Sequence, residues 1–273
     1  MAITSLSDYY SAARQQALLT KMAAVTVVSG GFCSVFDVAG QPGAGVLAGT
    51  STAAGVVPTD ATVGCPPIGA FSGGKGYFNS VVFANSVTSR IMLFDMLFKA
   101  GQYAYTGGTT TLSSQPSYSG RVPGGTDFVG TQIWLETTVN FATGNTWSLQ
   151  VTYTDQGNNA GHTTITTGAL AAAGLVKNRM YQLALQAGDT GVRKIESVIV
   201  TNSATAMTAG NFNILVLRPL WDGSVMSAGL GDTHGPEKTG MMEVYTDSAL
   251  VMVVQPVGGN TGTPYSKAII LDK

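Results

Sequence analysis

Short runs in which apolar and polar residues alternate recur along the chain, and they predict β-strands. The clearest run is 147–154, where Trp147, Leu149, Val151 and Tyr153 alternate with Ser, Gln and Thr residues. A period of two indicates a strand with one buried face and one exposed face. Further strands are predicted at 90–98, 131–141, 162–167, 241–246, 249–255 and 268–271.

The stretch 181–220 is predicted to form three strands separated by turns. Its second run, 194–201, alternates with a period of two. Its third run, 212–217, is apolar on both faces, which predicts a central strand that is covered on both sides. Arg218-Pro219 is expected to end that strand, because proline cannot donate a hydrogen bond to a ladder.

Residues 1–22 carry the one strong helical pattern. Ser5, followed three residues later by Asp8, resembles a capping box with Asp in place of Glu. Four residues at helical spacing are candidates for a docking face: Leu6, Tyr10, Ala13 and Ala17. The helix either packs on its own sheet or forms an arm that docks on a neighbouring chain, because chain ends are often free to reach outward.

The turn-rich segment 38–76 is full of Gly, Pro, Ala and Thr, yet it has too many apolar residues for a free linker. We expect it to be an ordered, extended loop lying over the domain or over a neighbour. The predicted fold is all-β, an antiparallel β-sandwich or jelly-roll-like domain with one N-terminal helix. The predicted organisation is a helical arm at 1–22, a sandwich at 23–221 and a C-terminal β appendage at 222–273, packed on the main domain.

The composition limits the classes of function that this chain can have. Only 11% of the 273 residues are charged, and 35 are glycine. A surface with so few charges suits a chain that is largely covered by neighbours. The net charge of −1, without a cluster of Lys or Arg, argues against a dedicated nucleic-acid site. The sequence contains neither a long apolar run for a membrane span nor a secretory signal.

Few residues suggest chemistry. Cys33 and Cys65 are interpreted as two buried thiols or, alternatively, as one disulfide within or between chains. Residues 69–76 nearly match a phosphate-binding loop, but glycine replaces the hydroxyl residue that would hold magnesium. His162 and His234 lack the short spacing of a metal motif. We therefore expect no catalytic residues, no metal, no cofactor and no enzyme activity.

One carboxylate falls within an apolar run, and it needs a partner. Asp95 shares a face of the predicted strand 90–98 with Ile91, Leu93 and Leu97. A charge in such a row must be paired or hydrogen-bonded, or it must lie at the end of a sheet. We expect Asp95 to form a structural hydrogen bond, in preference to a catalytic role.

Four segments, in this order along the chain, carry a resemblance to a known family: MAITSLSDYYSA at 1–12, VFDVAGQPGAG at 35–45, VVPTDATVGCPP at 56–67, and LQAGDTGVRKIESV with TAGNFNILVLRPL between 185 and 220. Together they resemble a family of structural proteins from the virions of tailed bacteriophages. The resemblance covers residues 1–221 and brings no catalytic residues with it. It implies a component of the phage particle, made in the bacterial cytoplasm and assembled onto the head or, less readily, the tail.

The leading hypothesis is a decoration or cement protein that stabilises the capsid shell through non-covalent contacts with shell subunits and with copies of itself. A second hypothesis is a tail, baseplate or fibre-attachment protein. A third is a carbohydrate-binding module for host attachment, with Tyr103, Tyr105, Tyr118 and Trp221 stacking on a host glycan. The major capsid protein is a fourth, disfavoured because that role usually needs a long helix.

Overall fold

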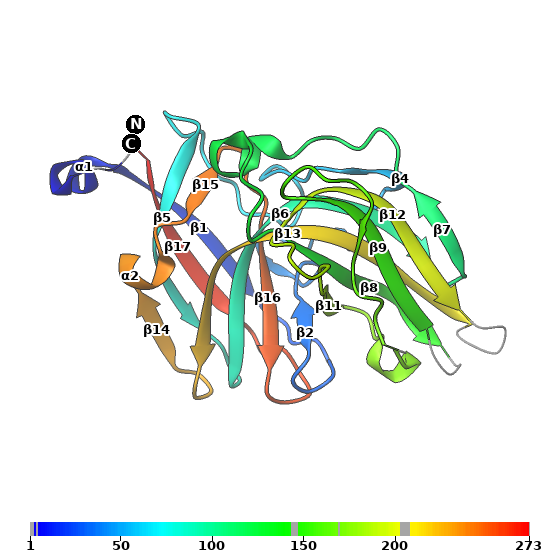
Figure 1. Cartoon of the computed structure of the whole chain (residues 1–273). Helices are drawn as coiled ribbons and strands as arrows, with labels where there is room; N and C mark the ends of the chain where they lie inside the picture. Colours follow the sequence, from blue (N-terminus) through cyan, green and yellow to red (C-terminus); the bar gives the residue numbers. More distant parts are fainter. Residues whose placement is uncertain (1–2, 4, 143–146, 169, 203–207, 273) are drawn as a thin grey trace.

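A closed ring of antiparallel strands forms the centre of the molecule in this computed structural model, which describes residues 3, 5–142, 147–168, 170–202 and 208–272 (Figure 1). The ring contains, in order, β13 (Ala209–Val225), β8 (Gln132–Ala142), β11 (Arg179–Leu183), β2 (Phe32–Ser34), β16 (Leu250–Pro256) and β6 (Ser89–Ala104). It closes because β13 also pairs with β6. A further strand, β4 (Ser51–Val56), pairs with β6 outside the ring.

A second sheet packs on one side of the ring and unites the two ends of the chain, which lie side by side in Figure 1. Its order is β14 (Gly231–His234), β5 (Lys75–Ala84), β17 (Tyr265–Asp272), β1 (Ala13–Lys21) and β3 (Gly40–Gln41), and β15 (Glu243–Tyr245) also pairs with β5. The pairing of β1 with β17 runs from Ala13 opposite Asp272 to Thr20 opposite Tyr265. The N-terminal and C-terminal segments therefore form one structural unit.

A third sheet lies at the other side of the molecule (Figure 1). It contains β10 (His162–Thr163), β9 (Trp147–Asp155), β12 (Val192–Asn202) and β7 (Gly108–Thr111). Helical structure in the described residues is short: α1 (Leu6–Ser11), α2 (Pro236–Thr239) and the 3-10 turns η1 (Ser119–Arg121), η2 (Pro123–Gly125) and η3 (Ala172–Gly174). None of these helices has the length and apolar character needed to span a bilayer.

Three hydrophobic cores follow from the alternation along the ring strands. In β6, Met92 and Phe94 belong to a core to which all six ring strands contribute, so this core fills the ring. Ile91 and Leu93, with opposite parity, pack toward the β5–β17–β1 sheet. Farther along, Leu97 joins the core shared with the β9–β12 sheet. Burial of each large apolar side chain contributes about 1.5–3 kcal/mol, so the three cores supply most of the stabilisation.

The predicted all-β fold is confirmed, as are several of its strands. In β9, Trp147, Leu149, Val151 and Tyr153 are fully buried. Residues 212–217 are buried on both faces of β13, which has a neighbour on each side. The loop-rich segment 38–76 packs over its own domain, with residues in two of the cores.

The predicted helix at 1–22 is wrong beyond its first turns. Ser5 does cap α1, since its side chain accepts a hydrogen bond from the Asp8 backbone N–H, but α1 ends at Ser11. From Ala13 the chain is a strand in which Ala17 is buried and its neighbours are more exposed. The helical spacing is overridden because β17 offers a complete hydrogen-bonding partner, and tertiary pairing outweighs a weak local propensity.

Residues 222–273 are likewise not an appendage. They supply β14, β15 and β17 to one sheet and β16 to the ring, so removing them would open both. The expected end of a strand at Arg218-Pro219 is also wrong, because β13 continues to Val225. Pro219 lies at an irregularity in the pairing with β6, where a missing N–H is tolerated.

Candidate functional site

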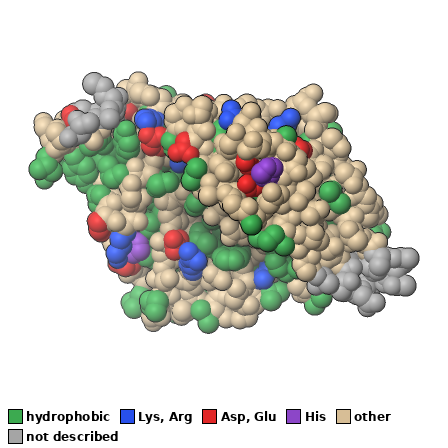
Figure 2. Space-filling model, viewed as in Figure 1, with side chains coloured by type: hydrophobic (Ala, Val, Ile, Leu, Met, Phe, Trp, Pro, Cys, Tyr) green, Lys and Arg blue, Asp and Glu red, His purple; other side chains and the backbone are tan. Residues whose placement is uncertain are grey.

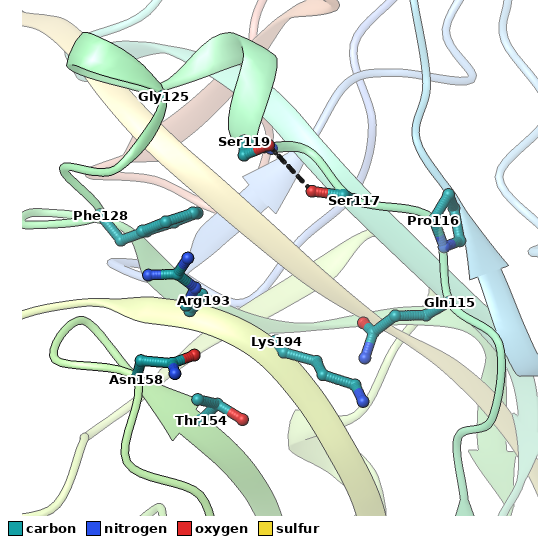
Figure 3. A pocket seen from close by; sticks show the side chains of 10 residues that line it. All are labelled: Gln115, Pro116, Ser117, Ser119, Gly125, Phe128, Thr154, Asn158, Arg193 and Lys194. Carbon is teal, nitrogen blue, oxygen red and sulfur yellow. Dashed lines mark hydrogen bonds between the residues drawn. The ribbon is translucent and has the colours of Figure 1, made fainter.

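A cavity of about 330 Å³ lies on the outer side of the β9–β12 sheet (Figure 3). Its walls come from β9, from β12 and from the segment that carries η1 and η2. In Figure 3, Arg193 lies between Phe128 and Asn158, and Lys194 extends toward Gln115. Two cationic side chains from consecutive residues therefore border one small cavity.

A β-bulge explains how consecutive residues of a strand line the same cavity. The register of β12 on β9 shifts between Val192, opposite Asp155, and Lys194, opposite Thr154. Arg193 is the extra residue, and such an insertion re-aims side chains that would otherwise alternate between faces. A second shift follows between Ile195 and Ser197. The predicted regular alternation over 194–201 is therefore wrong, although a strand is present.

The cavity carries unneutralised positive charge. The Arg193 guanidinium lies 4.9 Å from the centre of the Phe128 ring, a cation–π contact. Among the described residues, neither Arg193 nor Lys194 forms an ion pair with a carboxylate. The amide of Gln115 is occupied by the backbone of Ile195. The arrangement is suited to binding a small anionic group, since Arg and Lys supply only donors.

A cluster of an acid, a histidine and a second acid lies at the end of the same sheet. His162 Nδ1 is 2.7 Å from Asp189 Oδ2, and the Tyr153 hydroxyl donates to the same oxygen at 2.5 Å. Asp155 accepts hydrogen bonds from the backbone N–H of Asn159 at 2.7 Å and from its side-chain amide at 2.8 Å. Each of Asp155, His162 and Asp189 offers one potential ligand atom, and these three atoms lie within 4.8 Å of one another.

The electrostatics of this cluster favour bound positive charge. The hydrogen bond with Asp189 raises the pKa of His162, and the negative charges of Asp155 and Glu196 act in the same direction. The hydrogen bonds from Asn159 lower the pKa of Asp155, so that carboxylate stays ionised. Together these shifts describe a locally negative corner of a protein that has few charges.

Both cysteines are free and buried within this chain, which agrees with the interpretation as two buried thiols and not with a bridge between them. Burial raises the pKa of both thiols to about 12. Cys33 lies on β2 in the ring, and Cys65 packs in the core that fills the ring. Pairing with another chain would require both to leave the interior.

The four residues predicted as a docking face are divided between two elements. Leu6 and Tyr10 lie on α1 and are 73% and 72% exposed. Ala13 and Ala17 lie on β1, where Ala17 is buried against the neighbouring sheet. The prediction of a single helical docking face is therefore wrong, although its first two residues, Leu6 and Tyr10, are exposed on α1.

The loop at 69–76 is a turn into β5, and Lys75 forms an ion pair with Glu243. The stretch 231–234 is strand β14, and His234 accepts a hydrogen bond from the Trp221 indole at 2.9 Å. Of the aromatics suggested for sugar stacking, Tyr103, Tyr118 and Trp221 are buried, and Tyr105 packs partly buried against a core.

Sequence reasoning misses the acid–histidine cluster and the two cations. By sequence alone, Asp189 is a turn former and His162 is an isolated histidine on an edge strand. The available signal is the density of Asp, Asn and Gly around His162 in DQGNNAGH, together with AGDTG before β12. Only the pairing of β9 with β10 and β12 brings these two turns together.

No protein-family profile matches the chain, and no curated protein matches it. Among solved structures, the chain is similar to the VP2 subviral particle of infectious bursal disease virus, with 12% identity over 96% of this chain and 80% of that chain, at a TM-score of 0.22. It is also similar to the T13 particle of that virus (10% identity, 96% and 78% coverage, TM-score 0.24) and to T=1 particles derived from it (11%, 95% and 78%, TM-score 0.21).

These structures belong to a viral capsid protein, and the similarity to this chain is weak. TM-scores this low describe a loose overlap of two backbones, and function does not follow from them.

Proposed function

We propose that this protein is a structural component of a tailed-phage virion, a decoration or cement protein that stabilises the head shell by contact and catalyses no reaction. The sequence resemblance to phage virion proteins supports this assignment for residues 1–221. The low charge content of 11% supports it as well, because a surface with few charges is suited to being covered by neighbours.

The observation that carries the proposal is the projecting N-terminal segment. Helix α1 extends away from the sheets in Figure 1, and none of its described residues is buried. It nevertheless presents Leu6 and Tyr10, two large side chains that are more than 70% exposed. A small apolar anchor on a rigid β body can bind a neighbouring subunit, and repetition of that contact by symmetry stabilises a shell.

The test is binding of the purified chain to phage heads that lack it. Two variants remove the anchor without touching β1: deletion of residues 1–11, and the double substitution Leu6→Ser with Tyr10→Ser. We expect occupancy on the heads to fall about tenfold or more, since loss of an interface anchor commonly costs over 1.4 kcal/mol. Their thermal unfolding should stay close to that of the parent chain, because none of the residues of α1 is buried.

A matched control is Val257→Ser, which removes another exposed apolar side chain, 66% exposed, from a loop remote in sequence from α1. It should leave occupancy unchanged. Full occupancy by the deletion variant would remove α1 as the anchor. Recovery of the chain only with separated tails would replace the head assignment with a tail, baseplate or fibre-attachment role.

Glycan binding and the major capsid role have less support. Host-glycan binding through stacked aromatics loses its basis, because three of the four aromatics suggested for stacking are buried. The major capsid role would require the copy number of the shell subunit itself. Gel densitometry of purified particles, measured against the shell protein, separates that role from decoration.

A further inference from the structure

The acid–histidine cluster joins three separate segments of the chain. Asp155 ends β9, His162 begins β10, and Asp189 lies in the turn before β12. The Asp155 residue is 3% exposed, whereas the side chains of Asp189 and His162 are 6% and 24% exposed. The two carboxylates are therefore largely shielded, and the imidazole is partly exposed to solvent. Figure 2 shows both histidines of the chain on the viewed face, each beside acidic side chains.

We propose that Asp155, His162 and Asp189 form a binding site for a zinc ion. Their ligand atoms lie within 4.8 Å of one another, and bonds of about 2.0–2.2 Å to zinc would hold them some 3.3 Å apart. The 2.7 Å contact between His162 Nδ1 and Asp189 Oδ2 would have to lengthen and any wider separation would have to close, which are small shifts for residues at loop ends. One histidine nitrogen with two carboxylates leaves a fourth, tetrahedral position for water.

The chemistry of the ligand set selects the metal. Calcium and magnesium prefer six or more oxygen ligands or several retained waters, and imidazole is a poor ligand for both. Imidazole with carboxylates is a common zinc set, and a site closed by thiolates is not available here, because both cysteines are buried elsewhere. We therefore expect zinc to bind in preference to calcium.

The supporting hydrogen bonds already orient both carboxylates. Asn159 holds Asp155 through two hydrogen bonds, and Tyr153 holds Asp189 through one. On Asp189, Tyr153 and His162 both contact Oδ2, so Oδ1 is the oxygen that can bind a metal. Each oxygen of Asp155 accepts one hydrogen bond from Asn159 and keeps a second lone pair for a metal. Partners of this kind orient metal ligands, and their loss commonly weakens metal binding tenfold or more, on the order of 10–100-fold.

A second, independent observation is the uncompensated charge at this corner. Glu196 lies next to the cluster and accepts a hydrogen bond from the Gly161 backbone N–H at 3.1 Å. In the described part of the chain, no Lys or Arg forms an ion pair with Asp155, Asp189 or Glu196. Among the residues described, three carboxylates thus have a single imidazole, and no Lys or Arg ion pair, to offset their charge, and a divalent cation would supply the remaining positive charge.

The experiment uses the full chain, stripped with a chelator and titrated with zinc alone by calorimetry. We expect one zinc ion per chain and a higher unfolding temperature, because a ligand that binds only the folded state stabilises it. Asp189→Asn and His162→Gln should each weaken binding about tenfold or more. Cobalt added in place of zinc should give the visible absorption of a four-coordinate site in the parent chain and lose it in both variants.

The second histidine supplies a matched control. His234 lies 3.5 Å from the single carboxylate of Asp232, on the strand β14 of another sheet. His234→Gln should leave zinc stoichiometry and affinity unchanged. Zinc binding to the parent chain at well below one ion, binding that His234→Gln abolishes, or binding of calcium but not zinc would each overturn the proposal. The parent titration alone decides the matter if a cluster variant fails to fold.

Discussion

Two groups of charged residues in this protein illustrate opposite uses of charge. Asp95, on β6, is completely buried where the outer face of the ring passes from one core to the other, and it contacts Arg121 at 2.8 Å and Arg218 at 3.6 Å. Arg90 and Asp222 form an ion pair of similar length, 2.9 Å, on the surface, with side chains 45% and 52% exposed. Distance alone would rank the two pairs as equals.

The difference lies in what surrounds each carboxylate. Asp95 also accepts hydrogen bonds from the Ser248 hydroxyl at 2.8 Å and from the Ala249 backbone N–H at 3.0 Å. Arg121 in turn donates to the carbonyls of Pro58 and Asp247, so it ties η1 and two loops to β6. The exposed carboxylate of Asp222 can hydrogen-bond to water as well as to Arg90. The buried group around Asp95 therefore holds together the seam, which is the region of β6 where the cores of the two outer sheets meet. The surface pair Arg90–Asp222 makes no comparable set of contacts with the described residues.

The largest expected effect comes from breaking the buried group. Asp95→Asn keeps the shape of the side chain but leaves Arg121 and Arg218 without their counter-charge in the interior. Removal of one partner from a buried ion pair typically costs about 3–5 kcal/mol. Urea unfolding should show a loss of this size in the free energy of unfolding. A loss under about 1 kcal/mol would mean that the seam holds without its charges.

Sequence patterns predict much of the fold, because strands with one buried face leave a period of two. The run from Trp147 to Tyr153 is an example, whereas 212–217 is predicted as a central strand because it is apolar on both faces. The structural hydrogen bond expected of Asp95 is confirmed. The closure of the ring and the union of β1 with β17 are not predicted, because the pairing of β1 with β17 depends on partners more than 200 residues apart.

The candidate sites are harder to predict for a related physical reason. Arg193 and Lys194 share a cavity only because a bulge interrupts β12, and a bulge leaves no clear signature in alternation. His162 and Asp189 meet because β9 pairs with both β10 and β12, which brings together two turns that are separate in sequence. Local patterns identify which residues are buried, whereas a site depends on which distant residues meet.

An intermediate case lies between the buried and surface pairs. Lys75 donates a hydrogen bond to Glu243, with side chains 36% and 22% exposed, and the Tyr245 hydroxyl donates to the same carboxylate. Burial opposes the charge of Glu243, but hydrogen bonds from Lys75 and Tyr245 outweigh it and lower the pKa of this carboxyl. A lowered folded-state pKa stabilises the protein above the unfolded pKa, and this contribution disappears as pH falls through the folded value.

We therefore expect Lys75→Met to destabilise the protein by up to about 1 kcal/mol near neutral pH, since the pair is partly solvated. The loss should shrink in acid, below the ordinary carboxyl range, where Glu243 is protonated in the parent chain as well. Urea unfolding of both chains at neutral and acidic pH measures this difference. A loss that stays constant across that range would assign the effect to packing of the Lys75 stem.

The smallest expected effect belongs to the surface pair. Arg90→Gln and Asp222→Asn, separately and together, should change the free energy of unfolding by about 0–1 kcal/mol, with a coupling energy near the lower end. Both groups recover water when the partner is removed, and salt screens what remains of their attraction. A double-mutant cycle in low and in physiological salt measures this coupling. A coupling energy between Arg90 and Asp222 close to the cost of Asp95→Asn would contradict this expectation. Burial would then not explain the difference between the buried group around Asp95 and the surface pair.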